Sequence, residues 1–168
     1  NGIICSGEQS FIYHKDDKRE VMSAFIINGG YLVPDNERQK LIDTLFIDEH
    51  MNKEVVGKSA LEVAKLAGIE VPESTKVLIV EAKGVGSADI ISKEKMCPVL
   101  AAYSYDDLNE AISIVKVNLS IEGNGHTAGI HSKNQENILK AGSNISVSRF
   151  IVNAPCATTA GGNIQNGL

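Results

Sequence analysis

The chain has 168 residues, of which 43% are hydrophobic and 22% charged, so it is long enough for one globular domain with a real core. Its net charge of -5 excludes a general nucleic-acid binder, which would carry a basic patch. No apolar run approaches the roughly 20 residues that a membrane span needs, so we expect no membrane partner either.

Strand and helix patterns alternate along the chain, which is typical of an α/β fold with a largely parallel sheet. Three helices are expected to begin at capping residues, namely Asp17, Ser59 and Asp106, and Ser59 forms a capping-box pattern with Glu62. In chain order we predict a strand at 10–13, a helix at 17–28, a strand at 31–33, helices at 37–46 and 59–68, strands at 76–81 and 99–103, a helix at 106–119, a strand at 127–131, a helix at 134–141 and a strand at 149–153. Residues 158–168 have no periodicity and are expected to form a loop.

The cysteines and histidines narrow the class of protein further. Three cysteines, an odd and sparse set, do not make a disulfide framework, and they favour a reducing compartment such as the cytoplasm. The four histidines show no zinc spacing with one another or with the cysteines, so we expect no metal site. Because the chain opens on Asn1 and not on Met, we expect it to be a piece of a longer protein.

Cys5 is the first candidate for chemistry, because it lies between two isoleucines and the small polar stretch 6–10. A cysteine on a turn between an apolar segment and a strand can be exposed to substrate. Backbone N–H groups of such a turn can stabilise a thiolate and hold a developing oxyanion. Free cysteine is also among the most buried residue types, so an inert structural cysteine is the competing interpretation.

His126 is the second candidate, since it follows Gly123-Asn124-Gly125 at the start of a predicted strand. Glycines let a backbone approach a ligand closely. A histidine there could donate a hydrogen bond to a carbonyl oxygen or move a proton near a thiolate. A plain surface turn is an equally good interpretation of the same residues.

Glu94 is the third candidate, four residues before Pro98 in the loop that leads to a predicted strand. A carboxylate in such a loop can accept hydrogen bonds from ribose hydroxyls. Together with its neighbours Lys93 and Lys95, it also forms a charged run of the kind that is usually solvated, and composition alone favours that interpretation.

Taken in their order and spacing along the chain, the segments that hold these candidates resemble one family, the CoA-acylating aldehyde dehydrogenases. Residues 1–10 resemble the family's nucleophile segment, and Glu94 to Pro98 resemble its Glu-x-x-x-Pro segment. Gly125-His126-Thr127 resembles the Gly-His-Thr signature of the acylating branch, and residues 152–155 resemble a strand near the end of its catalytic domain. The likeness covers essentially the whole chain.

Within this family the chain is most similar to the CoA-dependent succinate semialdehyde dehydrogenases, and the acetaldehyde enzymes look more distant. The stretches that carry the closer likeness are 93–100, 125–132 and 157–162.

The resemblance implies a three-layer α/β fold, with a mostly parallel sheet and helices on both faces. Residues 1–168 would be the catalytic-cysteine domain, and the cofactor-binding domain would lie outside this chain. The implied enzyme converts an aldehyde, NAD(P)+ and coenzyme A to acyl-CoA and NAD(P)H through a thioester on Cys5. The expected aldehyde is succinate semialdehyde.

The resemblance also assigns roles to single residues and implies partners. His126 matches the family's histidine near the catalytic centre, for which an acid/base or carbonyl-orienting role is our hypothesis, and Glu94 matches the glutamate that contacts the nicotinamide ribose. NAD or NADP is the expected cofactor and coenzyme A the co-substrate. The full-length protein is expected to be a cytoplasmic homo-oligomer, and this piece alone is expected to be inactive.

Three alternatives remain open at this point. The aldehyde could be acetaldehyde, as in the acetylating enzymes. Cys5 and His126 could form the dyad of a cysteine hydrolase, with Asn153 as a nominal third member. The chain could also be a non-catalytic α/β interaction module whose cysteine is incidental.

Overall fold

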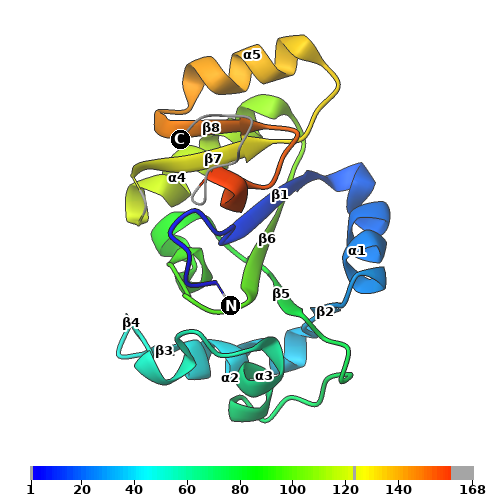
Figure 1. Ribbon diagram of the computed structural model, residues 1–168, viewed down its shortest axis with the longest axis vertical. Helices are drawn as coiled ribbons and strands as arrows, with labels where there is room; N and C mark the ends of the chain where they lie inside the picture. The colour runs from blue at the N-terminus through cyan, green and yellow to red at the C-terminus, as the bar shows by residue number, and fades with distance from the viewer. Residues whose placement is uncertain (1, 123, 160–168) are drawn as a thin grey trace.

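The computed structural model describes residues 2–122 and 124–159, and a parallel sheet runs through its centre (Figure 1). The sheet has 4 strands in the order β1-β6-β5-β2, and each neighbouring pair is parallel. These strands are β1 (Ser10–His14), β6 (Val99–Tyr105), β5 (Val77–Glu81) and β2 (Gly30–Leu32). The two inner strands, β5 and β6, are covered on both faces of the sheet, which explains why they read as nearly continuous apolar runs in the sequence.

Helices cover both faces of this sheet. On one face, α1 (Lys18–Ile27) packs Met22 and Phe25 against side chains of β1 and β5. On the other face lies the main core, to which α2 (Asp35–Leu45) and α3 (Ala60–Leu66) contribute most of their apolar side chains. The predicted three-layer α/β architecture is therefore confirmed.

A second, smaller layer of sheet lies beyond β1 at the upper end of the molecule (Figure 1). It consists of β7 (Gly125–Ile130) and β8 (Val147–Val152), which are parallel to each other. The helices α4 (Leu108–Ile121) and α5 (Gln135–Asn144) share an apolar cluster with these two strands. Because α4 also places Ile114 in the main core, it joins the two layers.

Most of the predicted elements are present, although several of their ends are displaced by one or two residues, and two of these differences have an identifiable place in the sequence. The helix expected to begin at Asp106 is capped by Asp107, whose carboxylate accepts hydrogen bonds from the backbone N–H groups of Asn109 and Glu110 at 2.7 and 3.1 Å. The helix expected to end at residue 141 continues as α5 to Asn144, and Gly142 in its last turn faces the Phe150 ring.

Several short elements went unpredicted. They include the antiparallel pair β3 (Phe46–Ile47) and β4 (His50–Met51) and two 3-10 turns that matter below, η4 (Ile90–Ser92) and η5 (Cys156–Thr159). The expected loop at 158–168 lies outside the described residues from 160 onwards. Within the described part of the chain, no helix has the length and apolarity to cross a membrane.

Candidate functional site

Cys5 lies on a tight turn directly before β1, and its side chain is exposed. The turn is closed by a hydrogen bond of 2.8 Å from the Gly7 backbone N–H to the Ile4 carbonyl oxygen. Next to the exposed cysteine, Ser6 is buried, and its hydroxyl has no hydrogen-bond partner among the described residues. The sequence prediction of an exposed cysteine on a turn before a strand thus agrees with the geometry, and the inert, buried interpretation does not.

The segment that carries Cys5 is seated on the loop before β6. Gly2 has a φ of +68°, and a Cβ atom there would come within 2.6 Å of the Cys97 carbonyl oxygen, so the close approach requires glycine. On the other side of Cys5, the Gln9 side-chain oxygen accepts a hydrogen bond of 3.0 Å from the Lys95 backbone N–H. The turn and the loop 93–97 are therefore in direct contact at two points.

Glu94 lies in this same loop, and its side chain is exposed to solvent. Its backbone N–H donates to the Glu122 carboxylate at 2.5 Å, and the hydrogen bonds of the described residues leave its own carboxylate unengaged. An exposed, unengaged carboxylate of this kind can accept hydrogen bonds from the hydroxyl groups of a ribose. The prediction of a solvated charged run is therefore correct for Glu94 but not for Lys95.

Lys95 is fully buried, so the prediction that the whole charged run is solvated is wrong at this residue. Its ammonium donates hydrogen bonds to the carbonyl oxygens of Ile91 and Lys93 at 2.9 and 2.8 Å. The chain between η4 and β6 therefore wraps around the Lys95 side chain, whose ammonium bonds two of its carbonyl oxygens. Burial lowers the pKa of Lys95 to about 8, because the charged form loses its hydration.

A buried lysine with a lowered pKa gives a pH dependence of known sign. The unfolded chain binds this proton more tightly than the folded chain does, so the free energy of unfolding rises with pH from about 8 towards 10.5. Burial also raises the pKa of the Cys97 thiol from 9.0 to about 11, which lowers stability above pH 9. Between pH 8 and pH 9 Lys95 alone adds about 1 kcal/mol to the free energy of unfolding and Cys97 removes about a third of that, so we expect a net gain of about two thirds of a kcal/mol in urea unfolding.

Lys95→Met should abolish that gain, whereas Lys93→Met should keep it, because the Lys93 ammonium lies at the surface, where it donates a hydrogen bond to the Glu49 carbonyl oxygen. Equal slopes for the Lys95→Met variant and the unsubstituted protein between pH 8 and pH 9 would refute the assignment.

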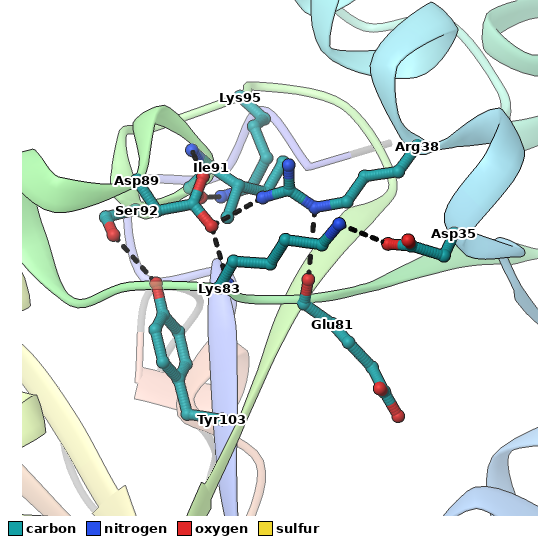
Figure 2. A network of polar contacts seen from close by, with 9 residues as sticks. All are labelled: Asp35, Arg38, Glu81, Lys83, Asp89, Ile91, Ser92, Lys95 and Tyr103. Carbon is teal, nitrogen blue, oxygen red and sulfur yellow. Dashed lines mark hydrogen bonds and ion pairs between the residues drawn. The ribbon is translucent and has the colours of Figure 1, made fainter.

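A buried ion pair anchors the other end of the loop to α2 (Figure 2). The Arg38 guanidinium contacts the Asp89 carboxylate at 2.5 Å, with side chains only 12% and 6% exposed. Asp89 also accepts hydrogen bonds from the backbone N–H groups of Lys83 and Ile91 at 2.7 and 3.3 Å. One carboxylate thus connects α2, the chain after β5 at Lys83 and η4 at Ile91, upstream of Glu94.

His126 is the second residue of β7 and is half-buried. Its Nδ1 atom shares a hydrogen bond of 2.8 Å with the Thr127 hydroxyl, which fixes the ring. Two residues further along the chain, Gly129 faces η5 so closely that a Cβ atom there would lie 3.0 Å from the Cys156 sulfur. The Cys156 backbone N–H in turn donates to the Glu8 carboxylate at 2.7 Å, so β7 connects back to the Cys5 turn through η5.

The three predicted site residues are joined only through intermediaries. Within residues 2–122 and 124–159, no hydrogen bond or ion pair links Cys5, His126 and Glu94 to one another directly. Asn153 does not orient His126, because its side chain both accepts from and donates to the backbone of Ser132, at 2.9 and 3.0 Å. The hydrolase arrangement with Asn153 as third member is therefore not formed.

Two shallow surface hollows do not coincide with this site. One lies along α1 and the other at the end of α3, and neither is lined by Cys5, His126 or Glu94. No cluster of three or more metal-ligating side chains occurs in the part of the chain that the structure describes.

Comparison with known proteins gives this geometry its context. No protein-family model matches the chain. The succinate-semialdehyde dehydrogenase (acetylating) of Clostridium kluyveri is 51% identical over 169 residues, which cover 100% of this chain and 37% of that protein. The aldehyde-alcohol dehydrogenase of Clostridium acetobutylicum is 35% identical over 99% of this chain and 20% of its own length.

The fold agrees with the sequence likeness. The crystal structure of an acetylating aldehyde dehydrogenase from Geobacillus thermoglucosidasius matches with a TM-score of 0.92 and 30% identity, over 99% of this chain and 37% of that one. The chain belongs to the CoA-acylating aldehyde dehydrogenase family. It spans about a third of the length of its acylating relative from Clostridium kluyveri.

Membership of the acylating aldehyde dehydrogenase family confirms the resemblance stated from the sequence. Sequence reasoning singled out Cys5, His126 and Glu94 but gave no role to Glu8, Gln9 or Lys95. Glu8 and Gln9 follow the cysteine directly, and a long polar side chain beside a reactive turn is a signal that could have been used. Nothing in the local sequence marks Lys95 as buried, because its burial comes from the tertiary packing of the loop.

Proposed function

We propose that this chain is the catalytic-cysteine part of an enzyme that converts an aldehyde, NAD(P)+ and coenzyme A to acyl-CoA and NAD(P)H. The observation that carries the proposal is the exposed Cys5 on its closed turn, in a chain that aligns over its whole length with an acylating aldehyde dehydrogenase. The acylating chemistry needs an open thiol, and the other two cysteines, Cys97 and Cys156, are buried and half-buried respectively.

The proposed reaction runs through covalent intermediates on Cys5. The Cys5 thiolate adds to the aldehyde carbon and forms a thiohemiacetal. When NAD(P)+ is bound, it accepts the hydride that leaves this carbon, and the thiohemiacetal loses its hydroxyl proton to become a thioester. The thiol of coenzyme A then loses its proton and attacks the thioester carbon, the bond from that carbon to the Cys5 sulfur breaks, and acyl-CoA leaves while the Cys5 thiolate is restored.

His126 is proposed to act on the carbonyl group of the aldehyde, and Glu94 is proposed to bind the cofactor that accepts the hydride. The bond between His126 Nδ1 and the Thr127 hydroxyl leaves Nε2 for the substrate, where it can orient the carbonyl or move a proton. The exposed carboxylate of Glu94 fits hydroxyl groups of a ribose, so this residue would receive the nicotinamide end of the cofactor. A solved relative, an engineered glycolyl-CoA reductase 26% identical to this chain, contains NADP+.

Succinate semialdehyde is the proposed aldehyde, because the relative at 51% identity is named for it. Acetaldehyde is the second candidate, supported by the acetylating enzyme with the TM-score of 0.92. A structure of propionaldehyde dehydrogenase from Rhodopseudomonas palustris with bound propionyl-CoA, 25% identical to this chain, supports an acyl-CoA product in either case.

The rest of the enzyme is proposed to complete the site. Ile3 and Ile4 beside the cysteine are 52% and 46% exposed, and such apolar flanks fit a surface that another domain covers. We assign residues 1–168 to the catalytic domain, and we propose that the cofactor-binding domain lies elsewhere in a homo-oligomeric protein. An odd and sparse set of three cysteines fits a cytoplasmic location.

A substrate panel with the full-length protein tests this function. Succinate semialdehyde, acetaldehyde and propionaldehyde would each be supplied with NAD+ or NADP+ and coenzyme A, and thioester formation would be followed together with reduced cofactor. We expect CoA-dependent acyl-CoA formation with ping-pong kinetics and the highest kcat/KM for succinate semialdehyde. Free acid as the product, independent of coenzyme A, would contradict the acylating chemistry, and a preference for acetaldehyde would contradict the substrate alone.

A further inference from the structure

Two neighbouring side chains after the proposed nucleophile reach into two remote parts of the chain. The Glu8 carboxylate accepts a hydrogen bond of 2.7 Å from the backbone N–H of Cys156, 148 residues later. The Gln9 side-chain oxygen accepts one of 3.0 Å from the backbone N–H of Lys95, 86 residues later. Both acceptors therefore lie within four residues of Cys5, and both donors are backbone N–H groups. A substitution of the donor residue by any residue other than proline would keep its N–H group.

Each of these partners adjoins one side of the proposed site. Lys95 directly follows Glu94, on the side assigned to the nicotinamide. Cys156 begins η5 and contacts Gly129 of β7, the strand that carries His126. The turn with Cys5 is consequently tied to both sides, although among the described residues no hydrogen bond or ion pair joins any two of the three site residues.

We propose, on the basis of the function proposed above, that Glu8 and Gln9 are positioning residues that hold Cys5 between the Glu94 loop and the His126 strand. Covalent catalysis of this kind needs the thiolate at a fixed distance from the carbonyl carbon and the hydride acceptor. A displacement of about 1 Å costs about 100-fold in rate, so a loosened turn slows acyl transfer while leaving the thiol in place.

The same carboxylate has an effect on the second thiol. Burial, and after it the negative charge of Glu8, raises the pKa of Cys156. Cys156 is therefore kept as a neutral thiol that does not compete with Cys5 for the aldehyde. The geometry of the two hydrogen bonds carries the proposal, and this electrostatic effect supports it.

The test varies the reach and the charge of the two side chains separately in the full-length enzyme. Glu8→Gln and Gln9→Glu keep the length and an accepting oxygen, whereas Glu8→Asp and Gln9→Asn shorten the side chain by one methylene group. We expect Glu8→Asp and Gln9→Asn, with their shorter side chains, to lose about 100-fold in kcat with little change in KM. Glu8→Gln and Gln9→Glu, which keep the side-chain length, should stay within about threefold of the unsubstituted enzyme. Rates would be compared on the plateau of each pH profile, so that a changed charge beside the thiol does not enter.

Two further measurements separate positioning from other causes. Alkylation of Cys5 by iodoacetamide should proceed at similar rates in all variants, because the thiol stays exposed. Glu73→Ala and Gln135→Ala serve as controls, since both residues are exposed and lie in the loop before β5 and at the start of α5. Both controls should retain the unsubstituted rate.

The outcomes distinguish this inference from the proposed function. Shortened variants as fast as the unsubstituted enzyme, or a Glu8→Gln variant slower than Glu8→Asp, would overturn the positioning role and leave the function standing. An unsubstituted enzyme that forms no acyl-CoA from any aldehyde would overturn both.

Discussion

Cys5→Ala in the full-length enzyme is expected to abolish acyl-CoA formation, with a loss of about 10⁴-fold or more, because the substitution removes the thiol that would carry the acyl chain and the neighbouring Ser6 hydroxyl is buried. Cys5→Ser is expected to be nearly as inactive, since a hydroxyl is a far weaker nucleophile than a thiolate at neutral pH. Product formation would be measured as thioester and as reduced cofactor.

Cys97→Ala is the matched control for this experiment. The Cys97 thiol is buried, and its pKa of about 11 keeps it protonated, so it cannot act as the nucleophile. We expect the control to form acyl-CoA at close to the unsubstituted rate. Appreciable acyl-CoA formation by Cys5→Ala would place the nucleophile elsewhere.

Asp89→Ala is expected to have the largest effect on stability, lowering the free energy of unfolding by about 3 to 5 kcal/mol. The substitution leaves the Arg38 guanidinium buried without its partner, and it removes the acceptor for the backbone N–H groups of Lys83 and Ile91. Because these bonds hold the chain upstream of Glu94, the loop that we assign to the cofactor should also lose order. Urea unfolding and hydrogen exchange of residues 83–95 would measure the two effects.

The exposed pair Lys83–Asp35 provides the comparison, because its side chains are 58% and 75% exposed (Figure 2). Asp35→Ala should shift the unfolding midpoint little, since solvent screens a surface ion pair. The double variant Arg38→Met/Asp89→Leu should be clearly more stable than Asp89→Ala, because neither buried charge is left alone. Equal effects of Asp89→Ala and Asp35→Ala would show that the buried pair does not anchor the loop.

The fold was largely predictable because its signals are local. Capping residues such as Ser59, the apolar runs of β5 and β6 and the helical spacing in α4 depend only on neighbours in the sequence. The errors at the start of α4 and at the end of α5 arise where the local signal is ambiguous. Either of the adjacent aspartates Asp106 and Asp107 could cap a helix, and a glycine such as Gly142 often marks a helix end although α5 continues through it.

The candidate site was predictable only in part. Cys5, His126 and Glu94 were singled out because they lie beside turns and glycines, and the family resemblance gave them roles that remain proposals. Sequence reasoning missed the burial of Lys95 and two bonds between remote segments. Glu8 bonds Cys156 across 148 residues, and Gln9 bonds Lys95 across 86 residues. Contacts of that kind depend on how the layers pack, and a single sequence holds no local signal for them.

The central claim is that Cys5 carries the acyl group, and trapping that group tests it most directly. The full-length enzyme would be incubated with succinate semialdehyde and NAD(P)+ in the absence of coenzyme A, quenched in acid, digested, and analysed by mass spectrometry. We predict one acyl adduct, on the peptide that contains Cys5, which disappears when coenzyme A is added before the quench. An adduct on Cys97 or Cys156, or CoA-dependent turnover without any adduct on Cys5, would contradict the account.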